Sequence, residues 1–329
     1  MAAVDVNSDS AQMRWLPVAL FGSVMGLTGL SLAWRLAHAH FGTPIWIAQG
    51  IGILAITAFV AMTTGYAIKA LTGFSHVRAE FNHPVAGALF GTPLISALLL
   101  PAILADMNQL LARALWIAGA VGMTIFAWHM AGRWLGVGQQ RPHATPAWMV
   151  PLVGMLDIPL AVPALGFSEP PHVVMMLGLS VGLFFAIPLF TIIFSRLMFE
   201  EPLAPAMSPS LLIMLAPFAV GFSSYVTTIG RMDALAEGLF GIALFMFAVL
   251  LTRLKQLRSC CPFRVSWWSV SFPLAALAGA SVRYASITQA LWSDVMAAGL
   301  LAFASAIIGG LFVRTMSGIV KNDLQKLSG

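Results

Sequence analysis

Charged residues are scarce in this chain of 329 residues. Asp, Glu, Lys and Arg together make up 9% of it, whereas about 25% is usual for a soluble globular protein. Cysteine is scarcer still, at two residues, so a secreted fold held by disulfides is excluded. Hydrophobic residues make up 59% of the chain, and the mean hydropathy is +0.90. This is the composition of an integral membrane protein, and it excludes a soluble enzyme and a nucleic-acid-binding module.

Motifs that carry chemistry are missing as well. The chain has no His-Glu-x-x-His zinc motif, no Gly-x-Ser-x-Gly nucleophile elbow and no phosphate-binding P-loop. Its histidines do not form a ligand set, because His38 and His40 are two positions apart and His129 stands alone. We therefore predict neither an enzyme nor a metal or cofactor site.

Long apolar runs bounded by charges, Pro and Gly predict ten transmembrane spans, since about 20 apolar residues cross a bilayer as a helix. The predicted spans are 17–36, 45–68, 84–105, 110–132, 147–166, 172–195, 210–229, 235–252, 266–287 and 291–313. A tight turn at 106–108 makes the third and fourth spans an antiparallel hairpin. The predicted fold class is an all-α integral membrane protein, with a short N-terminus at 1–15, a ten-helix transmembrane domain at 16–314 and a short tail at 315–329.

The basic residues predict the orientation of the chain. When the N-terminus is placed in the cytoplasm, only Arg35, Arg113, Arg231 and Arg283 fall outside. The residues that fall inside are Arg14, Lys69, Arg78, Arg133, Arg141, Arg196, Arg253, Lys255, Arg258, Arg264, Arg314, Lys321 and Lys326. This asymmetry follows the positive-inside rule. Because the number of spans is even, the C-terminus is predicted to be cytoplasmic too, in a multi-pass protein of a bacterial inner (plasma) membrane.

Proline is unevenly distributed among the predicted spans. An internal proline removes an amide donor and kinks the helix, which leaves a backbone acceptor that lipid cannot satisfy. The prolines inside odd spans are Pro93, Pro101, Pro151, Pro159, Pro163, Pro217 and Pro273, whereas the even spans have only Pro188. The first span carries Gly22, Gly26 and Gly29 instead, which leave one face open to close helix packing or to a passage. This alternation predicts five helical hairpins, with odd helices inside and even helices facing lipid; an irregular bundle is the alternative.

Ionisable residues are nearly absent from the middle of the spans. Arg113, Arg283 and Arg314 lie within about two turns of a span end, where their heads reach the interface. Asp157 lies near the middle of the fifth span, two residues before Pro159, with no obvious cationic partner. Two interpretations stay open. Asp157 is either a protonatable site or charge filter in a pathway, or a neutral carboxyl that satisfies backbone groups freed by the prolines, since burial favours the neutral form.

A pathway without fixed charges passes ions when its walls offer partial charges and small residues set its width. Aromatic side chains beside helix kinks are then natural gates. The candidates beside predicted kinks are Phe90, Pro93, Pro217, Phe218, Phe272 and Pro273, and the further pore-lining candidates are Gly22, Gly26 and Pro159.

Four stretches of the sequence carry a resemblance to a known family. They are residues 20–34, 77–85 (Val-Arg-Ala-Glu-Phe-Asn-His-Pro-Val), 215–218 (Leu-Ala-Pro-Phe) and 268–275 (Trp-Ser-Val-Ser-Phe-Pro-Leu-Ala). From about residue 15 to 318 the chain resembles the tellurite-resistance and dicarboxylate transporter family, in the voltage-dependent anion channel superfamily that includes the plant slow-type guard-cell anion channels. The Arg-x-Glu-(Phe/Tyr)-x-x-Pro-Val stretch is its most specific element.

The resemblance implies a fold and a function. It implies ten helices with quasi-fivefold symmetry, odd helices around a central pore, a homotrimer with one pore per subunit, and a Phe gate that matches Phe272. It further implies passage of small monovalent anions such as chloride and nitrate. The alternative is a secondary transporter or exporter of a C4-dicarboxylate, sulfite or a tellurium oxyanion, coupled to protons through Asp157. Two features depart from the family pattern: Pro273 stands where a small residue is expected, and Asp157 has no acidic counterpart.

Overall fold

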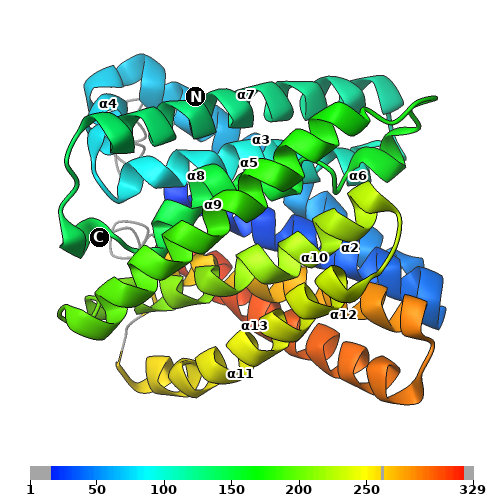
Figure 1. The fold of residues 1–329 in the computed structure, drawn as a ribbon. Coiled ribbons are helices and arrows are strands. Elements are labelled where there is room, and N and C mark those ends of the chain that lie inside the picture. Colours follow the sequence, from blue (N-terminus) through cyan, green and yellow to red (C-terminus); the bar gives the residue numbers. More distant parts are fainter. Residues whose placement is uncertain (1–15, 261–262, 322–329) are drawn as a thin grey trace.

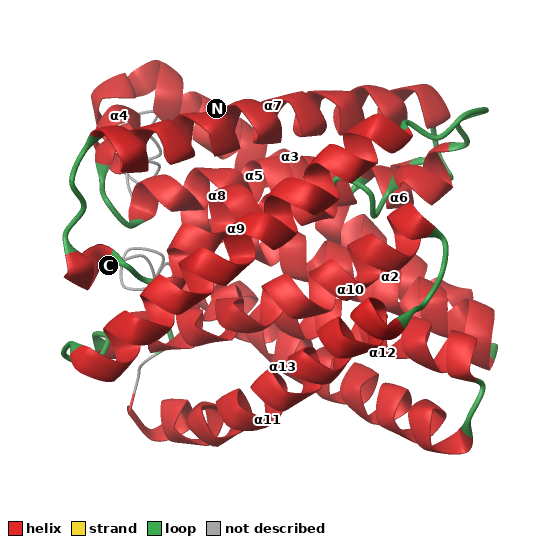
Figure 2. Ribbon diagram, in the orientation of Figure 1, coloured by secondary structure: helices red, strands yellow, loops and turns green. Residues whose placement is uncertain are grey.

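The structure is a computed structural model that describes residues 16–260 and 263–321. Within these ranges the chain forms helices joined by short loops, and it has no strand (Figure 2). The predicted N-terminal segment 1–15 and residues 322–329 of the predicted tail lie outside them. The all-α class predicted from composition is therefore confirmed for the described chain.

Nine helical segments of the described chain are long and apolar enough to cross a membrane. They are Val18–Phe41, Ile45–Thr72, Ala86–Leu104, Gln109–Gly136, His172–Phe199, Pro205–Ile229, Ala234–Thr252, Val265–Thr288 and Leu291–Val320. Nine of the ten predicted spans thus correspond to helical segments. Several segments extend past the predicted ends: the first continues through His38 and His40, which we expected in a loop. Both histidines lie in its last turn, where the helix dipole favours positive charge.

The tight turn predicted at 106–108 is present. Helix α6 (Pro101–Leu104) ends just before it, and α7 (Gln109–Gly136) begins just after it. Asn108 caps α7, because its side chain accepts a hydrogen bond of 3.0 Å from the backbone N–H of Leu111. The third and fourth segments therefore form the predicted hairpin.

The fifth predicted span is not a continuous helix, and this corrects the sequence prediction. It consists of η4 (Pro146–Trp148), α8 (Met149–Val153), η5 (Gly154–Asp157) and η6 (Val162–Leu165). Three prolines interrupt its ladder of amide donors, and Gly166 ends it with a φ of 57°. Residues 144–159 are nevertheless all buried. The prolines predicted a kinked helix, but their combined effect is larger and breaks the helix into short pieces.

Helix α7 supplies hydrogen bonds that this broken segment cannot make internally. The indole N–H of Trp116 in α7 donates to the carbonyl of Ile158 at 2.9 Å. Arg113 donates from Nε to the carbonyl of Leu165 at 2.8 Å. These donors satisfy carbonyls that the broken helix leaves free, so the segment depends on its contact with α7.

Five long helices form an outer layer: α3 (Ile45–Thr72), α7, α9 (His172–Phe199), α11 (Ala234–Cys260) and α13 (Leu291–Val320). Of these, α7, α9 and α11 lie at the front and the edges of the view in Figure 1. Between 17% and 39% of the most apolar window of each is buried, compared with 67% to 78% for the four odd-numbered spans that are helical. This difference confirms the predicted division into inner and outer segments.

The inner segments share a local design that the sequence did not reveal. Each begins with a 3-10 helix and continues as an α-helix. The pairs are η1 (Val18–Leu20) with α2 (Phe21–Phe41), η2 (Ala86–Phe90) with α5 (Gly91–Leu99), η4 with α8, η7 (Pro205–Leu215) with α10 (Ala216–Ile229), and η8 (Val265–Val270) with α12 (Ser271–Thr288). The 3-10 elements contact one another in turn, η1–η2–η4–η7–η8–η1, and so close a ring. We call the end of the bundle formed by these five 3-10 elements the leading end.

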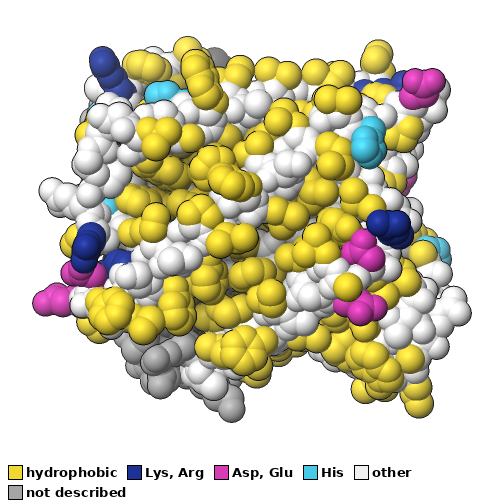
Figure 3. Space-filling view, in the orientation of Figure 1, with side chains coloured by type: hydrophobic (Ala, Val, Ile, Leu, Met, Phe, Trp, Pro, Cys, Tyr) yellow, Lys and Arg dark blue, Asp and Glu magenta, His cyan; other side chains and the backbone are white. Residues whose placement is uncertain are grey.

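The outer surface is suited to lipid. In Figure 3 hydrophobic side chains cover the middle of the visible face, and charged side chains gather at two opposite edges. Phe184 of α9 and Phe245 of α11 are exposed to 69% and 67%. In water such exposure would be costly, whereas a bilayer accommodates it. The described chain is therefore a multi-pass membrane protein.

Candidate functional site

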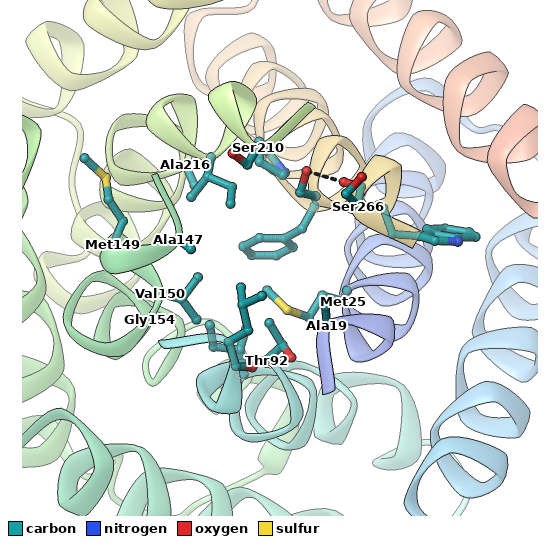
Figure 4. Close-up of a pocket in the computed structure, with 18 of the residues that line it drawn as sticks. Ala19, Met25, Thr92, Ala147, Met149, Val150, Gly154, Ser210, Ala216 and Ser266 are labelled. Atoms are coloured by element: carbon teal, nitrogen blue, oxygen red, sulfur yellow. Dashed lines mark hydrogen bonds between the residues drawn. The ribbon is translucent and has the colours of Figure 1, made fainter. Parts of the chain in front are cut away.

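A cavity of about 260 Å³ lies inside the ring at the leading end. All five inner segments line it, through residues within 17–25, 85–95, 147–157, 207–220 and 265–273, and no described residue of the outer helices does so. Figure 4 shows Ala19, Thr92, Val150, Ser210 and Ser266 placed around this space. Chain segments far apart in the sequence thus converge on one half-open and mostly apolar cavity.

Phe272 lines this cavity from the first turn of α12. It is 7% exposed, and its ring lies against α2, since a Cβ placed on Gly29 would be 3.4 Å from its Cδ2 atom. Trp268 is the other large aromatic residue of the lining, but its indole N–H donates to Thr315 Oγ1 at 3.0 Å. Phe272 has no such polar tie, so its ring is held in place by packing alone.

Two other predicted pore residues, Gly22 and Pro273, also line the cavity, whereas Gly26 does not. A Cβ on Gly26 would lie 2.1 Å from Oγ of Ser271. The same Oγ donates to the carbonyl of Trp268 at 2.6 Å and lies 3.2 Å from that of Gly22. The glycine face of the first span was predicted to allow either close helix packing or a passage. Gly26 serves close packing between α2 and α12.

The remaining aromatic candidates turn toward the outer layer. The ring of Phe90 makes edge contacts with Tyr66 and Phe81, at centroid distances of 6.0 and 5.0 Å. The ring of Phe218 contacts Phe190 of α9 at 5.5 Å. Neither residue lines the cavity, and neither do Pro93, Pro159 and Pro217. A place for these five residues along a pore stays a prediction.

Asp157 lines the cavity at the end of η5 and is 2% exposed. Its Oδ1 atom is buried without a hydrogen-bond partner. Among the described residues no hydrogen bond joins its carboxyl to the backbone around Pro159 or Pro163. The arrangement does not support the interpretation in which Asp157 satisfies backbone groups that the prolines free.

A buried polar network at the leading end was missed by the sequence reasoning. Glu80 Oε2 accepts hydrogen bonds from Lys69 Nζ at 2.7 Å and from the Tyr66 hydroxyl at 3.0 Å. Its Oε1 accepts one from the backbone N–H of Val18 at 2.8 Å, and Lys69 Nζ also donates to the carbonyl of Leu16 at 2.7 Å. The network ties the start of the first inner segment to α3 and to α4 (Phe74–Asn82).

The stretch 77–85 that contains Glu80 also contacts other segments near the cavity. Arg133 Nη1 donates to the carbonyl of Phe81 at 3.1 Å, and the indole N–H of Trp148 donates to that of Pro84 at 3.0 Å. His83 Nδ1 accepts the backbone N–H of Ala86 at 3.1 Å and so caps η2. The Arg-x-Glu stretch was therefore the sequence feature that could have indicated this network. Its hydrogen-bond partners lie up to 64 positions away and could not be predicted from it.

The fold and the cavity together define a multi-pass membrane protein with a half-open cavity between its inner segments. Residues 16–316 match the family described as voltage-dependent anion channel, and the chain belongs to this family. The family consists of anion channels and transporters. The resemblance seen in the sequence is therefore confirmed.

Individual relatives support the same assignment. The chain is 27% identical over 312 residues to the S-type anion channel SLAH3 of Arabidopsis thaliana, which covers 91% of this chain and 48% of that protein. It is 24% identical over 311 residues to the guard cell S-type anion channel SLAC1 of the same plant, at 91% and 55% coverage. It is 26% identical over 311 residues to the tellurite resistance protein TehA homolog of Haemophilus influenzae, at 94% and 92%. The chain spans about half the length of these two plant relatives.

Proposed function

We propose that this protein is an anion channel that passes small monovalent anions, such as chloride and nitrate, through a pore between its inner segments, and that Phe272 is the gate. The observation that carries the proposal is the closed ring of five inner segments around a cavity that Phe272 lines. The names of SLAH3 and SLAC1, both S-type anion channels, support it.

The chemistry of the walls supports selection among anions. Among the described residues that line the cavity none is Lys or Arg, so a passing anion would meet partial charges and no fixed positive charge. Walls of this kind replace a tightly held hydration shell poorly. Weakly hydrated anions should therefore pass more easily, with nitrate ahead of chloride and gluconate far behind.

The test is anion flux through protein reconstituted in liposomes or planar bilayers, comparing wild type with Phe272→Ala. Removal of the ring should raise chloride flux by at least roughly tenfold, which corresponds to lowering the barrier by about 1.4 kcal/mol. The current should reverse at the chloride equilibrium potential and follow the order of anion hydration.

Phe218→Ala is the matched control. Phe218 also lies beside a proline at the start of an inner α-helix, yet its ring contacts Phe190 and does not line the cavity. Its flux should stay near that of wild type. Equal fluxes in Phe272→Ala and wild type, in protein shown to be correctly assembled, would remove Phe272 from the gate.

A second candidate function is a secondary transporter or exporter of a C4-dicarboxylate, sulfite or a tellurium oxyanion, coupled to protons. The buried and unpartnered carboxyl of Asp157 favours it, as does the name of the tellurite resistance protein TehA homolog. This function predicts saturable uptake that depends on a proton gradient and is abolished by Asp157→Asn. Linear, voltage-driven flux that this substitution leaves unchanged would contradict it.

We further propose the assembly and topology around this pore. The broken fifth segment also crosses the membrane, which together with the nine helical segments makes ten crossings. The five hairpins have quasi-fivefold symmetry. Residues 16–314 form one pore domain in a bacterial inner membrane. Both termini lie in the cytoplasm, and three copies form a trimer with one pore each. The two closed rings of contacts, η1–η2–η4–η7–η8 and α2–α5–η5–α10–α12, support the symmetry. Native mass measurement and labelling of single cysteines at each terminus test the rest.

A further inference from the structure

Few side chains in the cavity are able to hold an anion, because most of the polar groups that line it are already engaged. The Thr92 hydroxyl donates to the carbonyl of Leu89 at 2.7 Å. Those of Ser210 and Ser269 donate to the carbonyls of Met207 at 2.7 Å and Ser266 at 2.6 Å, and the last bond is drawn in Figure 4. A hydroxyl has one proton to donate, so these three present only lone pairs to the cavity.

Two polar side chains of the lining remain. The Oγ atom of Ser266 is buried without a hydrogen-bond partner, and so is Oδ1 of Asp157. An unpartnered buried polar group costs free energy. Such groups are retained at membrane depth where they are used. They lie at two levels of one cavity, Ser266 in the ring of 3-10 elements and Asp157 beyond α8, so an anion in transit would meet them in turn.

The protonation state of Asp157 depends on the charges around η5. This element packs against α5, α7, α8, α9 and α10, of which α5 and α8 contain no titratable residue. On α9, η5 packs at Gly178 and Gly182, and the titratable residues His172 and Arg196 lie about 9 and 20 Å further along the helix axis.

The titratable groups of α7 and α10 are engaged elsewhere. Arg113 and Arg133 donate to backbone carbonyls at the two ends of α7, His129 stacks on Phe81, and Tyr225 donates to Asp233. No described positive charge therefore compensates a carboxylate at Asp157. A buried carboxyl in that position is most stable as the neutral acid.

We propose that the neutral carboxylic acid of Asp157 and the hydroxyl of Ser266 are the hydrogen-bond donors that a small monovalent anion meets in turn as it passes through the cavity. A neutral carboxylic acid is a good donor to an anion, as in enzymes that stabilise an oxyanion with one. Ionisation of Asp157 removes its proton and places a negative charge beside the anion, so flux falls as pH rises through the pKa of this group. The proposal rests on the proposed channel function and adds its recognition chemistry and its pH control.

The test is chloride and nitrate flux as a function of pH, measured in the Phe272→Ala background so that the gate does not limit it. Asp157→Asn keeps a donor that does not ionise, and it should retain flux and lose the pH dependence. Asp157→Leu removes the donor and should lower flux at every pH. Ser266→Ala should lower flux by roughly tenfold, the scale of one hydrogen bond to a charged group.

Matched controls separate recognition from folding. Ser281→Ala removes a buried α12 hydroxyl that donates to the Ala278 carbonyl and does not line the cavity. Asp106→Asn removes an exposed carboxylate that pairs with Arg35 at 2.6 Å. Both should leave the flux and its pH dependence unchanged. If Asp157→Asn keeps the pH dependence of its parent, or if Ser266→Ala conducts like Ser281→Ala, the proposal is wrong.

Infrared spectroscopy provides a readout that does not need flux. Wild-type protein in lipid at neutral pH should show the carbonyl band of a protonated carboxylic acid, which Asp157→Asn removes and which added nitrate shifts. A missing band, or a band that nitrate leaves in place, overturns the proposal even if no variant conducts. Failure of Phe272→Ala to conduct, with the band present and shifted by nitrate, would instead count against the channel function alone.

Discussion

The inner segments and the outer helices are made of the same apolar residues, yet the outer helices are continuous and the inner segments have an irregular backbone. Outer α13 runs for 30 residues without interruption, whereas the fifth inner segment is broken into four short elements. A helix against lipid must satisfy its own amides and carbonyls. The inner segment is surrounded by protein, and donors such as Trp116 complete its hydrogen bonds. Irregular backbone in this fold therefore marks protection from lipid.

Proline alone does not produce that irregularity. Outer helix α9 contains Pro188 and still runs from His172 to Phe199. The fifth inner segment has three prolines, Pro151, Pro159 and Pro163, and is buried throughout residues 144–159. One proline costs a single hydrogen bond and kinks a helix, but three within thirteen positions leave too few amide donors for any continuous turn to persist.

The largest expected loss of stability comes from removing the ion pair between Lys69 and Glu80, which links the outer helix α3 to the start of the first inner segment. Glu80→Gln leaves the Lys69 ammonium buried without its carboxylate, so we expect the free energy of unfolding to fall by about 3–5 kcal/mol. Lys69 and Glu80 are 6% and 15% exposed. The measurement is the unfolding midpoint in lipid nanodiscs or detergent, followed by tryptophan fluorescence.

Asp106→Asn is the control for that substitution. Its ion pair with Arg35 is 58% exposed on the acid side, and an exposed pair contributes about 0–1 kcal/mol. Replacing both Lys69 and Glu80 with apolar residues should recover part of the loss, since no unpaired charge remains. A Glu80→Gln protein as stable as Asp106→Asn would contradict the role of this network.

Replacing glycine with alanine should change the free energy of unfolding by a smaller amount, and with opposite sign in the two layers. Gly26→Ala places a Cβ 2.1 Å from Ser271 Oγ in the seam between α2 and α12, and overpacking should cost about 1–3 kcal/mol. Gly238→Ala on outer helix α11 meets no atom within 4 Å and should stabilise by about 0.5–1 kcal/mol, because alanine is the better helix former. Both are read from unfolding midpoints, and equal shifts would refute the contrast.

The smallest expected effect concerns the turn that joins inner α10 to outer α11. The Tyr225 hydroxyl donates to Asp233 Oδ2 at 2.7 Å, and this bond, helped by the backbone N–H groups of Ala236 and Leu235, holds the pKa of Asp233 below its ordinary value of 3.8. Because the folded-state pKa is the lower one, the carboxylate stabilises the fold above pH 3.8, and this contribution is lost as pH falls through the folded-state pKa.

Tyr225→Phe should raise the pKa of Asp233 and reduce that contribution. The unfolding midpoints of wild type and variant should differ by a constant amount at neutral pH, and the pH-dependent part of the difference should vanish in acid below 3.8. A gap that stays the same throughout the acid range would show that Tyr225 does not act on this carboxyl.

Much of the layered fold was predictable from sequence, because hydropathy and proline placement act locally. The hairpin turn at 106–108 and the inner position of the odd segments followed from such patterns. The ring of 3-10 elements did not, since nothing in residues such as Val18 or Val265 distinguishes a 3-10 turn from an α-turn. The loss of helix at Asp157 also escaped prediction, because it depends on how completely neighbours enclose the segment.

The candidate site was predictable in part. Gly22, Phe272 and Pro273, three of the predicted pore residues, line one cavity together with Asp157, the candidate protonatable site; their roles stay predictions. Phe90 and Phe218 were chosen by the same rule, a position beside a kink, yet their rings face the outer layer. The side of the helix on which a residue lies depends on the residue at which the 3-10 helix changes to an α-helix. A proline indicates that such a change is near, but it does not determine the position.

The seam between α2 and α12 also sets the order of events during synthesis. Ser271 Oγ in α12 lies 3.2 Å from the carbonyl of Gly22, 249 positions earlier in the chain, so α2 enters the membrane long before its main partner exists. At ~5–20 residues per second the wait is on the order of 10–50 s. During that time the glycine face of α2 has no permanent cover, and the ring closes only when the ninth segment arrives. A ribosome that stops before α12 therefore leaves the ring of inner segments open.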